Sequence, residues 1–150
     1  MKKNSPDKKI INRRARFDYE LGDAILVGIQ LTGKETKALR MGHGQLRGAY
    51  VNVVGDELWL VGAQISSAGG AILSEDEQTR SRKLLAKRRE IDQLIAARKQ
   101  GRTIVPMEIL TGGRYIKLRI SVGKGKKRYD KRETLKRRDQ EREMDRAKQK

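Results

Sequence analysis

Apolar residues that alternate with polar ones predict a β-hairpin in the last third of the folded part of the chain. Apolar residues stand at every second position from Ile116 to Val122, with Lys117 and Arg119 between them. This period of two places the apolar side chains on one face of a strand. A partner strand over 103–110 precedes it across a Thr-Gly-Gly turn, and Pro106 indicates an edge position or a bulge in that partner.

Similar β-rich runs occupy the first half of the chain. They cover residues 17–21, 25–31, 46–54 and 58–65. Gly22-Asp23 predicts a turn or bulge between the first two runs, and Gly55-Asp56-Glu57 predicts a hairpin between the last two. Trp59 is interpreted as a core residue.

Two helices are predicted by capping signals and by helical spacing. The first covers Gly33–Met41, with Thr32 as its cap and Glu35 at the third position after the cap. The second covers 75–100 and begins at a Ser-Glu-Asp-Glu sequence. Its apolar stripe comprises Leu84, Leu85, Ile91, Leu94 and Ile95.

Five or six antiparallel strands with one short and one long helix predict a mainly β fold class with helices. The arrangement that accommodates them best is a small antiparallel β-barrel of the oligonucleotide-binding (OB-like) type over residues 12–123, with flanking helices. Residues 1–11 are polar and rich in lysine, so we expect a disordered basic N-terminus. Residues 124–150 form a basic tail without a continuous apolar stripe, which we expect to be disordered when free and helical against RNA.

The charge of the chain indicates a polyanionic partner. Lys and Arg total 36 against 19 acidic residues, a net charge of +17 at pH 7. Seven basic residues and one acidic residue lie in 1–16, and 13 basic and six acidic residues lie in 124–150. Such an excess repels itself unless nucleic acid or another polyanion neutralises it. No apolar run approaches bilayer length, and neither end offers a basic helix with an apolar face, so no membrane partner is expected.

The sequence offers no set of residues for catalysis. Cysteine is absent, which excludes disulfides and thiolate metal sites and is consistent with a reducing cytoplasm. His43 is the only histidine and lies between two glycines, as expected for an exposed turn. No nucleophile, base and orienting group can be assembled, so we expect neither an enzyme, nor a metal site, nor a cofactor.

Four collinear stretches carry a resemblance to a known family. They are Asn12–Tyr19 (Asn-Arg-Arg-Ala-Arg-Phe-Asp-Tyr), Gly33–Arg40 (Gly-Lys-Glu-Thr-Lys-Ala-Leu-Arg), Arg80–Leu85 (Arg-Ser-Arg-Lys-Leu-Leu) and Lys124–Glu133 (Lys-Gly-Lys-Lys-Arg-Tyr-Asp-Lys-Arg-Glu). In this order and spacing the chain resembles the SsrA-binding protein family, the bacterial partners of transfer-messenger RNA (tmRNA) in trans-translation. The resemblance implies an OB-like barrel that grips the tRNA-like part of tmRNA, and delivery to stalled ribosomes with elongation factor Tu after charging by alanyl-tRNA synthetase. It also implies a tail that enters the decoding centre and the empty mRNA path of the small ribosomal subunit and becomes helical there.

The resemblance also implies two sets of RNA-contacting residues. Candidates for the tmRNA face are Asn12, Arg13, Arg14, Arg16, Tyr19, Lys37, Arg40, Arg80, Arg82 and Lys83. Candidates for the ribosomal decoding region are Lys124, Lys126, Lys127, Tyr129, Asp130, Lys131 and Arg132, with Tyr129 suited to stacking on a base. Glu35 is interpreted as a helix-capping residue, although it matches the family motif.

Several residues depart from the family pattern. Phe17 replaces a usual His, Leu26 stands where Glu is common, and Gly48-Ala49 replaces Asp-Ser. These positions are expected to alter RNA affinity and not the tail signature.

Two other interpretations are consistent with the same excess of positive charge: a structural ribosomal protein or RNA chaperone, and a nonspecific single-strand binder. The second needs exposed aromatic residues, and few are available.

Overall fold

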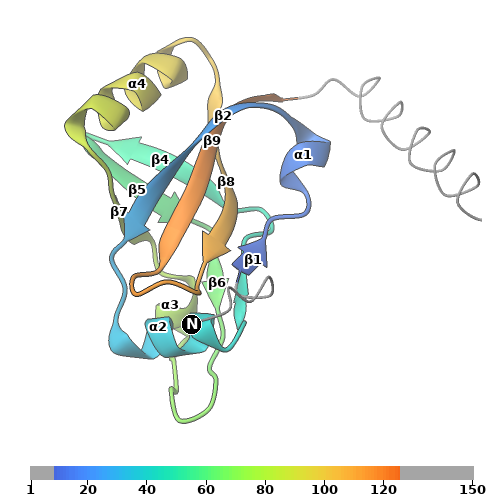
Figure 1. Ribbon diagram of the computed structural model, residues 1–150, viewed down its shortest axis with the longest axis vertical. Helices are drawn as coiled ribbons and strands as arrows, with labels where there is room; N and C mark the ends of the chain where they lie inside the picture. Colours follow the sequence, from blue (N-terminus) through green and yellow to red (C-terminus); the bar gives the residue numbers. More distant parts are fainter. Residues whose placement is uncertain (1–8, 126–150) are drawn as a thin grey trace, which may run out of the picture.

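The computed structural model describes residues 9–125, whose main body is a bent antiparallel sheet (Figure 1). Its strands are β1 (Lys9–Ile11), β2 (Tyr19–Ile29), β4 (Tyr50–Val54), β5 (Glu57–Val61), β7 (Arg82–Leu85), β8 (Thr103–Leu110) and β9 (Lys117–Gly125). A small second sheet pairs β3 (Gly44–Gln45) with β6 (Gln64–Ile65). The helices are α1 (Ala15–Asp18), α2 (Gly33–Arg40), α3 (Glu75–Thr79) and α4 (Arg88–Lys99). None of these helices is long and apolar enough to cross a bilayer.

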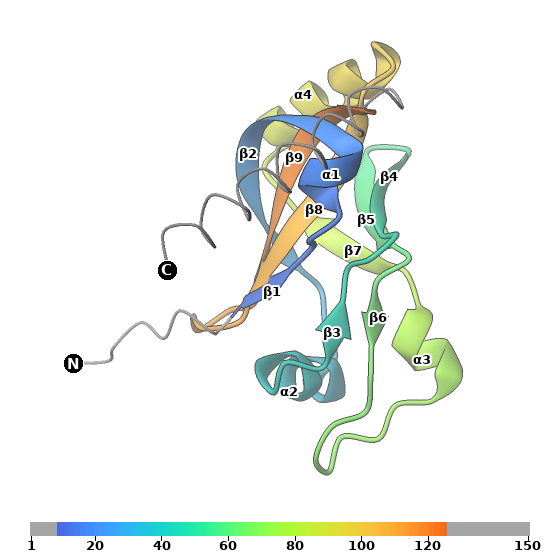
Figure 2. The ribbon, with the colours of Figure 1, turned by 90° about the vertical axis from the view of Figure 1, so that its right-hand side faces the viewer.

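The main sheet is not closed into a barrel, which corrects the predicted OB-like barrel. Its order is β1-β8-β9-β2-β7-β5-β4, and Figure 2 shows it bent so that β4 lies beside β8. Strand β1 pairs only with residues 108–110 of β8, and a bulge between Pro106 and Glu108 interrupts that strand. Proline lacks a backbone N–H and a bulge disrupts the ladder, so this edge offers poor pairing. Within residues 9–125, β4 therefore forms ladder hydrogen bonds with β5 alone.

Both predicted hairpins are confirmed. Strands β4 and β5 join at Gly55, whose φ of +61° suits the tight turn, and β8 and β9 pair along most of their length. Residues 17–31 differ from the prediction, because Phe17 lies in α1 and one strand, β2, runs from Tyr19 to Ile29. The expected bulge at Gly22-Asp23 is present, and Ser121 Oγ donates to the Gly22 carbonyl at 2.9 Å.

The helix predicted over 75–100 is wrong, because the structure contains α3, β7 and α4 in its place. Arg82 explains the break: its guanidinium lies inside the molecule and donates to the carbonyls of Glu77 and Gln78 at the end of α3. Leu84 is buried by pairing with β2 and β5, whereas Leu85 points outward and is 53% exposed. Long-range partners thus outweigh the local helical pattern.

The ends of the predicted domain also shift. Lys9–Ile11, predicted to be disordered, form β1 and pair with β8, and Ile10 packs against the core. Strand β9 continues to Gly125, two residues beyond the predicted boundary. The core is built from apolar residues of both parts of the bent sheet, including Leu58, Leu60, Leu118 and Ile120. Trp59 is half-buried on the opposite face from Leu58 and Leu60, so it is not the buried core residue that was predicted.

Candidate nucleic-acid interface

The N-terminal basic residues are held on a rigid corner. The backbone N–H of Asn12 donates to the Met107 carbonyl and its side-chain Nδ2 donates to the Pro106 carbonyl, both at 2.8 Å. The bulge in β8 frees these two carbonyls, so the predicted irregularity at Pro106 is what anchors Asn12.

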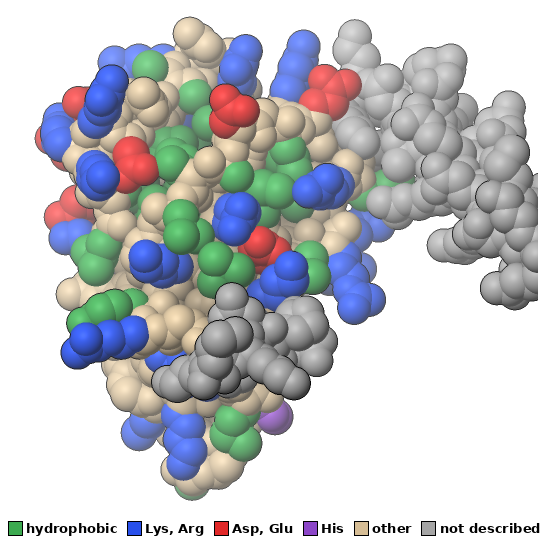
Figure 3. All heavy atoms as spheres, in the orientation of Figure 1, with side chains coloured by type: hydrophobic (Ala, Val, Ile, Leu, Met, Phe, Trp, Pro, Cys, Tyr) green, Lys and Arg blue, Asp and Glu red, His purple; other side chains and the backbone are tan. Residues whose placement is uncertain are grey.

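Short helix α1 then sets which side chains face solvent. Ala15 and Phe17 are buried on its inner side, so Arg13, Arg14 and Arg16 project outward. The Arg14 guanidinium lies 4.5 Å from the Phe17 ring centre and 3.5 Å from an Asp18 oxygen. These contacts orient Arg14, and the corner as a whole presents a preformed group of cations. Figure 3 shows that Lys and Arg side chains outnumber Asp and Glu side chains on the face it presents.

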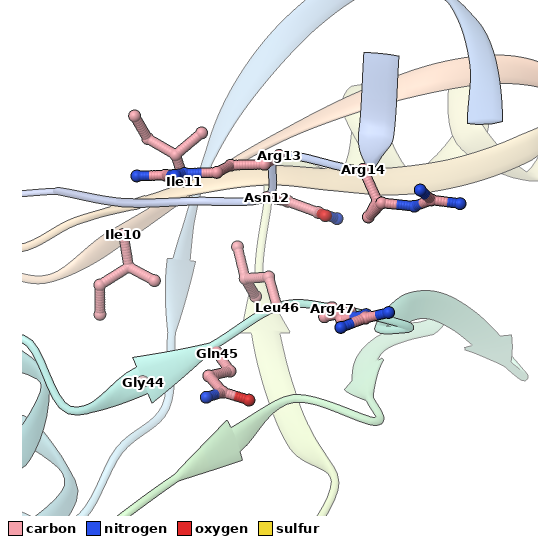
Figure 4. Close-up of a pocket in the computed structure, with 9 residues that line it drawn as sticks. All are labelled: Ile10, Ile11, Asn12, Arg13, Arg14, Gly44, Gln45, Leu46 and Arg47. Carbon is pink, nitrogen blue, oxygen red and sulfur yellow. The ribbon is translucent and has the colours of Figure 1, made fainter. Parts of the chain in front are cut away.

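Two hollows flank this corner. One of about 450 Å³ lies between residues 10–14 and residues 44–47 and includes Arg47, as Figure 4 shows. The other, of about 530 Å³, is lined by Arg16 and by Arg119, whose Nε lies 3.0 Å from a Glu108 oxygen. Arg47 was not a candidate from the sequence. It lies opposite residues 10–14, which are at least 33 positions earlier, and the local pattern does not reveal this proximity.

Tyr19 and Lys124 lie where the chain leaves the described region. Tyr19 opposes Gly125, and Glu20 opposes Lys124, at the end of the β2–β9 ladder. Gly123 permits this close approach, since a Cβ there would lie 3.1 Å from the Tyr19 Cβ. The start of the tail is therefore fixed beside α1. The other tail candidates, Lys126, Lys127, Tyr129, Asp130, Lys131 and Arg132, lie outside the described residues.

Arg82, which the sequence motifs place among the RNA contacts, is buried within the protein. Its side chain is 1% exposed, and its Nε donates to Glu35 Oε2 at 2.5 Å. Its other nitrogens donate to the carbonyls of Ala63, Glu77 and Gln78. With its donors facing inward, Arg82 has no path to a phosphate in this structure.

Glu35 is the centre of this buried network. It caps α2 as predicted, since Thr32 and Glu35 exchange backbone-to-side-chain hydrogen bonds of 2.9 and 3.3 Å. Its carboxylate also binds Arg80, which remains partly exposed. Burial raises the pKa of Glu35, but hydrogen bonds from Arg80, from the Thr32 backbone and from Arg82 outweigh it, so the pKa lies below its ordinary value.

The two predicted contacts on α2 differ in role. The Arg40 guanidinium donates to the carbonyls of Thr111, Gly113 and Arg114 at 2.9 to 3.0 Å, and so ties α2 to the β8–β9 loop. Lys37 is exposed and lies over Gly69 and Gly70. Of the two, Lys37 is the one whose charge is free to meet a phosphate.

A third region surrounds Lys83. Its Nζ lies 3.4 Å from a Glu57 oxygen, and the side chain remains 36% exposed. Beside it is an open hollow of about 540 Å³ whose walls include Leu26, Leu85 and Lys87. Leu26, which stands where the family commonly has Glu, is 42% exposed there, so this departure lies on the surface. No group of three metal-ligating side chains occurs in the described part of the chain.

The candidates thus lie in three places: the α1 corner, the exposed side of α2, and β7.

The whole sequence was compared with known protein families and relatives. The sequence matches the family profile described as "SmpB protein" over residues 9–150. It is 43% identical to an SsrA-binding protein of Nostoc sp. over 98% of this chain and 97% of the relative. It is 44% identical to one of Paracoccus denitrificans, over 96% and 95%.

The fold is also similar to a solved chain. That chain comes from a structure described as "tmRNA-SmpB: a journey to the center of the bacterial ribosome". The TM-score is 0.66 at 31% identity, over 85% of this chain and 94% of the solved one. The family resemblance seen in the sequence motifs is confirmed, and this chain belongs to the SmpB protein family.

Proposed function

We propose that this protein binds the tRNA-like domain of tmRNA (SsrA RNA) and delivers it to stalled ribosomes for trans-translation. The main support for this function is the family match over residues 9–150. This range includes the exposed arginines of the α1 corner and the basic tail. The relatives named above are SsrA-binding proteins, and the solved chain belongs to a tmRNA–SmpB–ribosome structure.

The geometry of the folded part supports a role in RNA binding. Arg13, Arg14 and Arg16 are exposed on a corner whose backbone is fixed by Asn12. Lys37 adds an exposed cation elsewhere on the surface, and Lys83 and Arg80 are partly exposed while paired with Glu57 and Glu35. Cations presented by an ordered backbone release counterions from phosphates at a reduced ordering cost, so they favour a structured RNA.

Within this function we assign the tail to the ribosome. Residues 124–150 would enter the decoding centre and the empty mRNA path, with Tyr129 stacking on a base. The resemblance supports cytoplasmic action alongside elongation factor Tu and alanyl-tRNA synthetase through the tmRNA complex. The protein acts by binding and not by catalysis.

Recovery of cellular RNA on the purified protein at moderate salt tests the proposal. Strong enrichment of tmRNA over ribosomal RNA is expected. Uniform recovery of ribosomal RNA would instead identify a structural ribosomal protein or an RNA chaperone. A protein that recovers single-stranded RNA regardless of sequence would be a nonspecific binder.

A further inference from the structure

The hollow between the α1 corner and β3 has the chemistry of a nucleotide site. Of its nine lining residues, three are arginines and none is acidic, and its volume of about 450 Å³ is within the range of small-ligand pockets. The floor includes Ile10 and Leu46, both of which belong to or pack against the core. An apolar floor under a cationic mouth suits a base below and a phosphate above.

Arg47 is presented to this hollow by a tight turn. The Ala49 N–H donates to the Leu46 carbonyl at 2.9 Å, and Gly48 has a φ of +77°, as a type II turn requires. Leu46 and Ala49 are buried on either side, so the turn is fixed while Arg47 is exposed. Within the described residues Arg47 forms no ion pair, and its full charge is available.

Arg14 and Arg47 extend in the same direction from opposite sides of the hollow (Figure 4). Arg14 is already oriented by Phe17 and Asp18. Two guanidinium groups that flank one opening can bind a single phosphate from both sides, since each presents a planar fork of donors.

Asn12 supplies an unused acceptor in the same wall. Its Nδ2 is bound to the Pro106 carbonyl, whereas Oδ1 is buried and accepts no hydrogen bond within residues 9–125. The side chain is nine-tenths buried, and an unmet buried acceptor is costly. Because Oδ1 has almost no accessible surface, a base amino or imino group in the hollow would supply the missing donor after a small shift of the wall around Asn12.

Building on the proposed function, we propose that this hollow binds one unstacked nucleotide of tmRNA and that Arg47 is a direct RNA contact. Arg14 and Arg47 hold its phosphate, the base lies on the apolar floor, and Asn12 Oδ1 accepts from the base edge. Arg47 is not among the residues that the family motifs assign to RNA.

Matched single-charge variants test this proposal. Arg47→Ala is compared with Arg102→Ala, an exposed arginine after α4 that lies away from the hollow. Binding of the tRNA-like domain transcript is measured by fluorescence anisotropy between 50 and 200 mM salt. We expect Arg47→Ala to weaken binding roughly tenfold and to reduce the salt slope by about one. Arg102→Ala should change affinity less than about twofold.

A photo-crosslinking group at Gln45, an exposed residue of the lining, tests the single-nucleotide claim. Crosslinks should map to one tmRNA nucleotide and should disappear when Arg47→Ala is added. Crosslinks spread over many nucleotides, or an Arg47→Ala affinity and slope equal to those of Arg102→Ala, would refute this site while leaving the proposed function intact. Failure of the unmodified protein to bind the transcript would instead refute the proposed function.

Discussion

At the scale of single residues, neighbouring cations have opposite roles. Arg82 and Lys83 are adjacent in β7, yet their side chains point to opposite faces, as strand geometry requires. Arg82 is bound within the protein by Glu35 and three carbonyls, whereas Lys83 is partly exposed. Charge in the sequence therefore does not measure charge available to RNA.

This contrast leads to a paired prediction. Arg82→Met leaves buried carbonyls without donors and removes one of the two cations of Glu35, so it should lower the free energy of unfolding by about 3 kcal/mol or more. Lys83→Met should change it by less than about 1 kcal/mol, because it removes a partly exposed ion pair. Urea unfolding measures both values. The RNA salt slope should fall by about one for Lys83→Met alone. If folded Arg82→Met protein also showed a reduced salt slope for RNA binding, Arg82 would be identified as an RNA contact.

Glu35 gives a pH prediction with a defined sign. Its folded pKa lies below the unfolded value of about 4.3, so its ionised form stabilises the fold above that pH. This stabilisation is lost as the pH falls through the folded pKa. Denaturant unfolding between pH 6 and pH 3 should therefore show a decline at the acidic end that is smaller in Glu35→Gln. Equal declines in the two proteins would assign acid sensitivity to other carboxylates.

At the scale of elements, helix α2 is positioned by both of its ends. Glu35 binds Arg80 and Arg82 near its start, and Arg40 binds three carbonyls of the β8–β9 loop at its end. The helix is thus a connection between β7 and the last hairpin. Lys37, on its exposed side, is placed by these contacts without taking part in them.

Arg40→Ala and Lys37→Ala separate these roles on one helix. Both remove one positive charge and introduce a good helix former. Arg40→Ala should lower the free energy of unfolding by about 1–3 kcal/mol, because it removes charged donors from three loop carbonyls. Lys37→Ala should change it by less than about 0.5 kcal/mol. Hydrogen exchange in residues 111–115 should rise only in Arg40→Ala. Unchanged exchange there would show that the loop is held by its own turn.

The sequence correctly predicted those structural features that depend on contacts between residues close together in the chain. The Thr32–Glu35 capping box, the Gly55 turn and the bulge at Pro106 depend on residues a few positions apart, and all are present. The 75–100 helix failed because Arg82 is bound by Glu35 and Ala63, which lie far away in sequence. For the same reason the sequence could not show that Arg47 faces Arg14, or that the Arg40 guanidinium binds loop carbonyls. Predicting those features requires the tertiary partner.

At the scale of the whole molecule, the chain just after the α1 corner pairs with the strand end from which the basic tail continues. Tyr19, directly after α1, pairs with Gly125, the last described residue. The tail therefore continues from a strand end that the β2–β9 ladder fixes opposite Tyr19. A tail that begins at a fixed point has a defined reach from bound tmRNA, which is what simultaneous engagement of two RNAs requires.

Truncation at this point tests the division of labour between the folded domain and the tail. A chain that ends at Gly125 keeps all of β9, whereas an earlier cut would remove its pairing with Tyr19 and confound stability with function. The truncated protein should bind tmRNA within a few-fold of the full chain, because the exposed arginines of the α1 corner remain. Tagging of peptides on stalled ribosomes should be abolished, because residues 126–150 carry all of the proposed decoding-centre contacts except Lys124. A full-length control with residues 126–150 in shuffled order keeps the tail charge and should also fail to tag. If the shuffled tail supported tagging, charge alone would explain its action. If truncation abolished tmRNA binding, the tail would belong to the tmRNA interface, and the protein could not hold two RNAs through two separate surfaces.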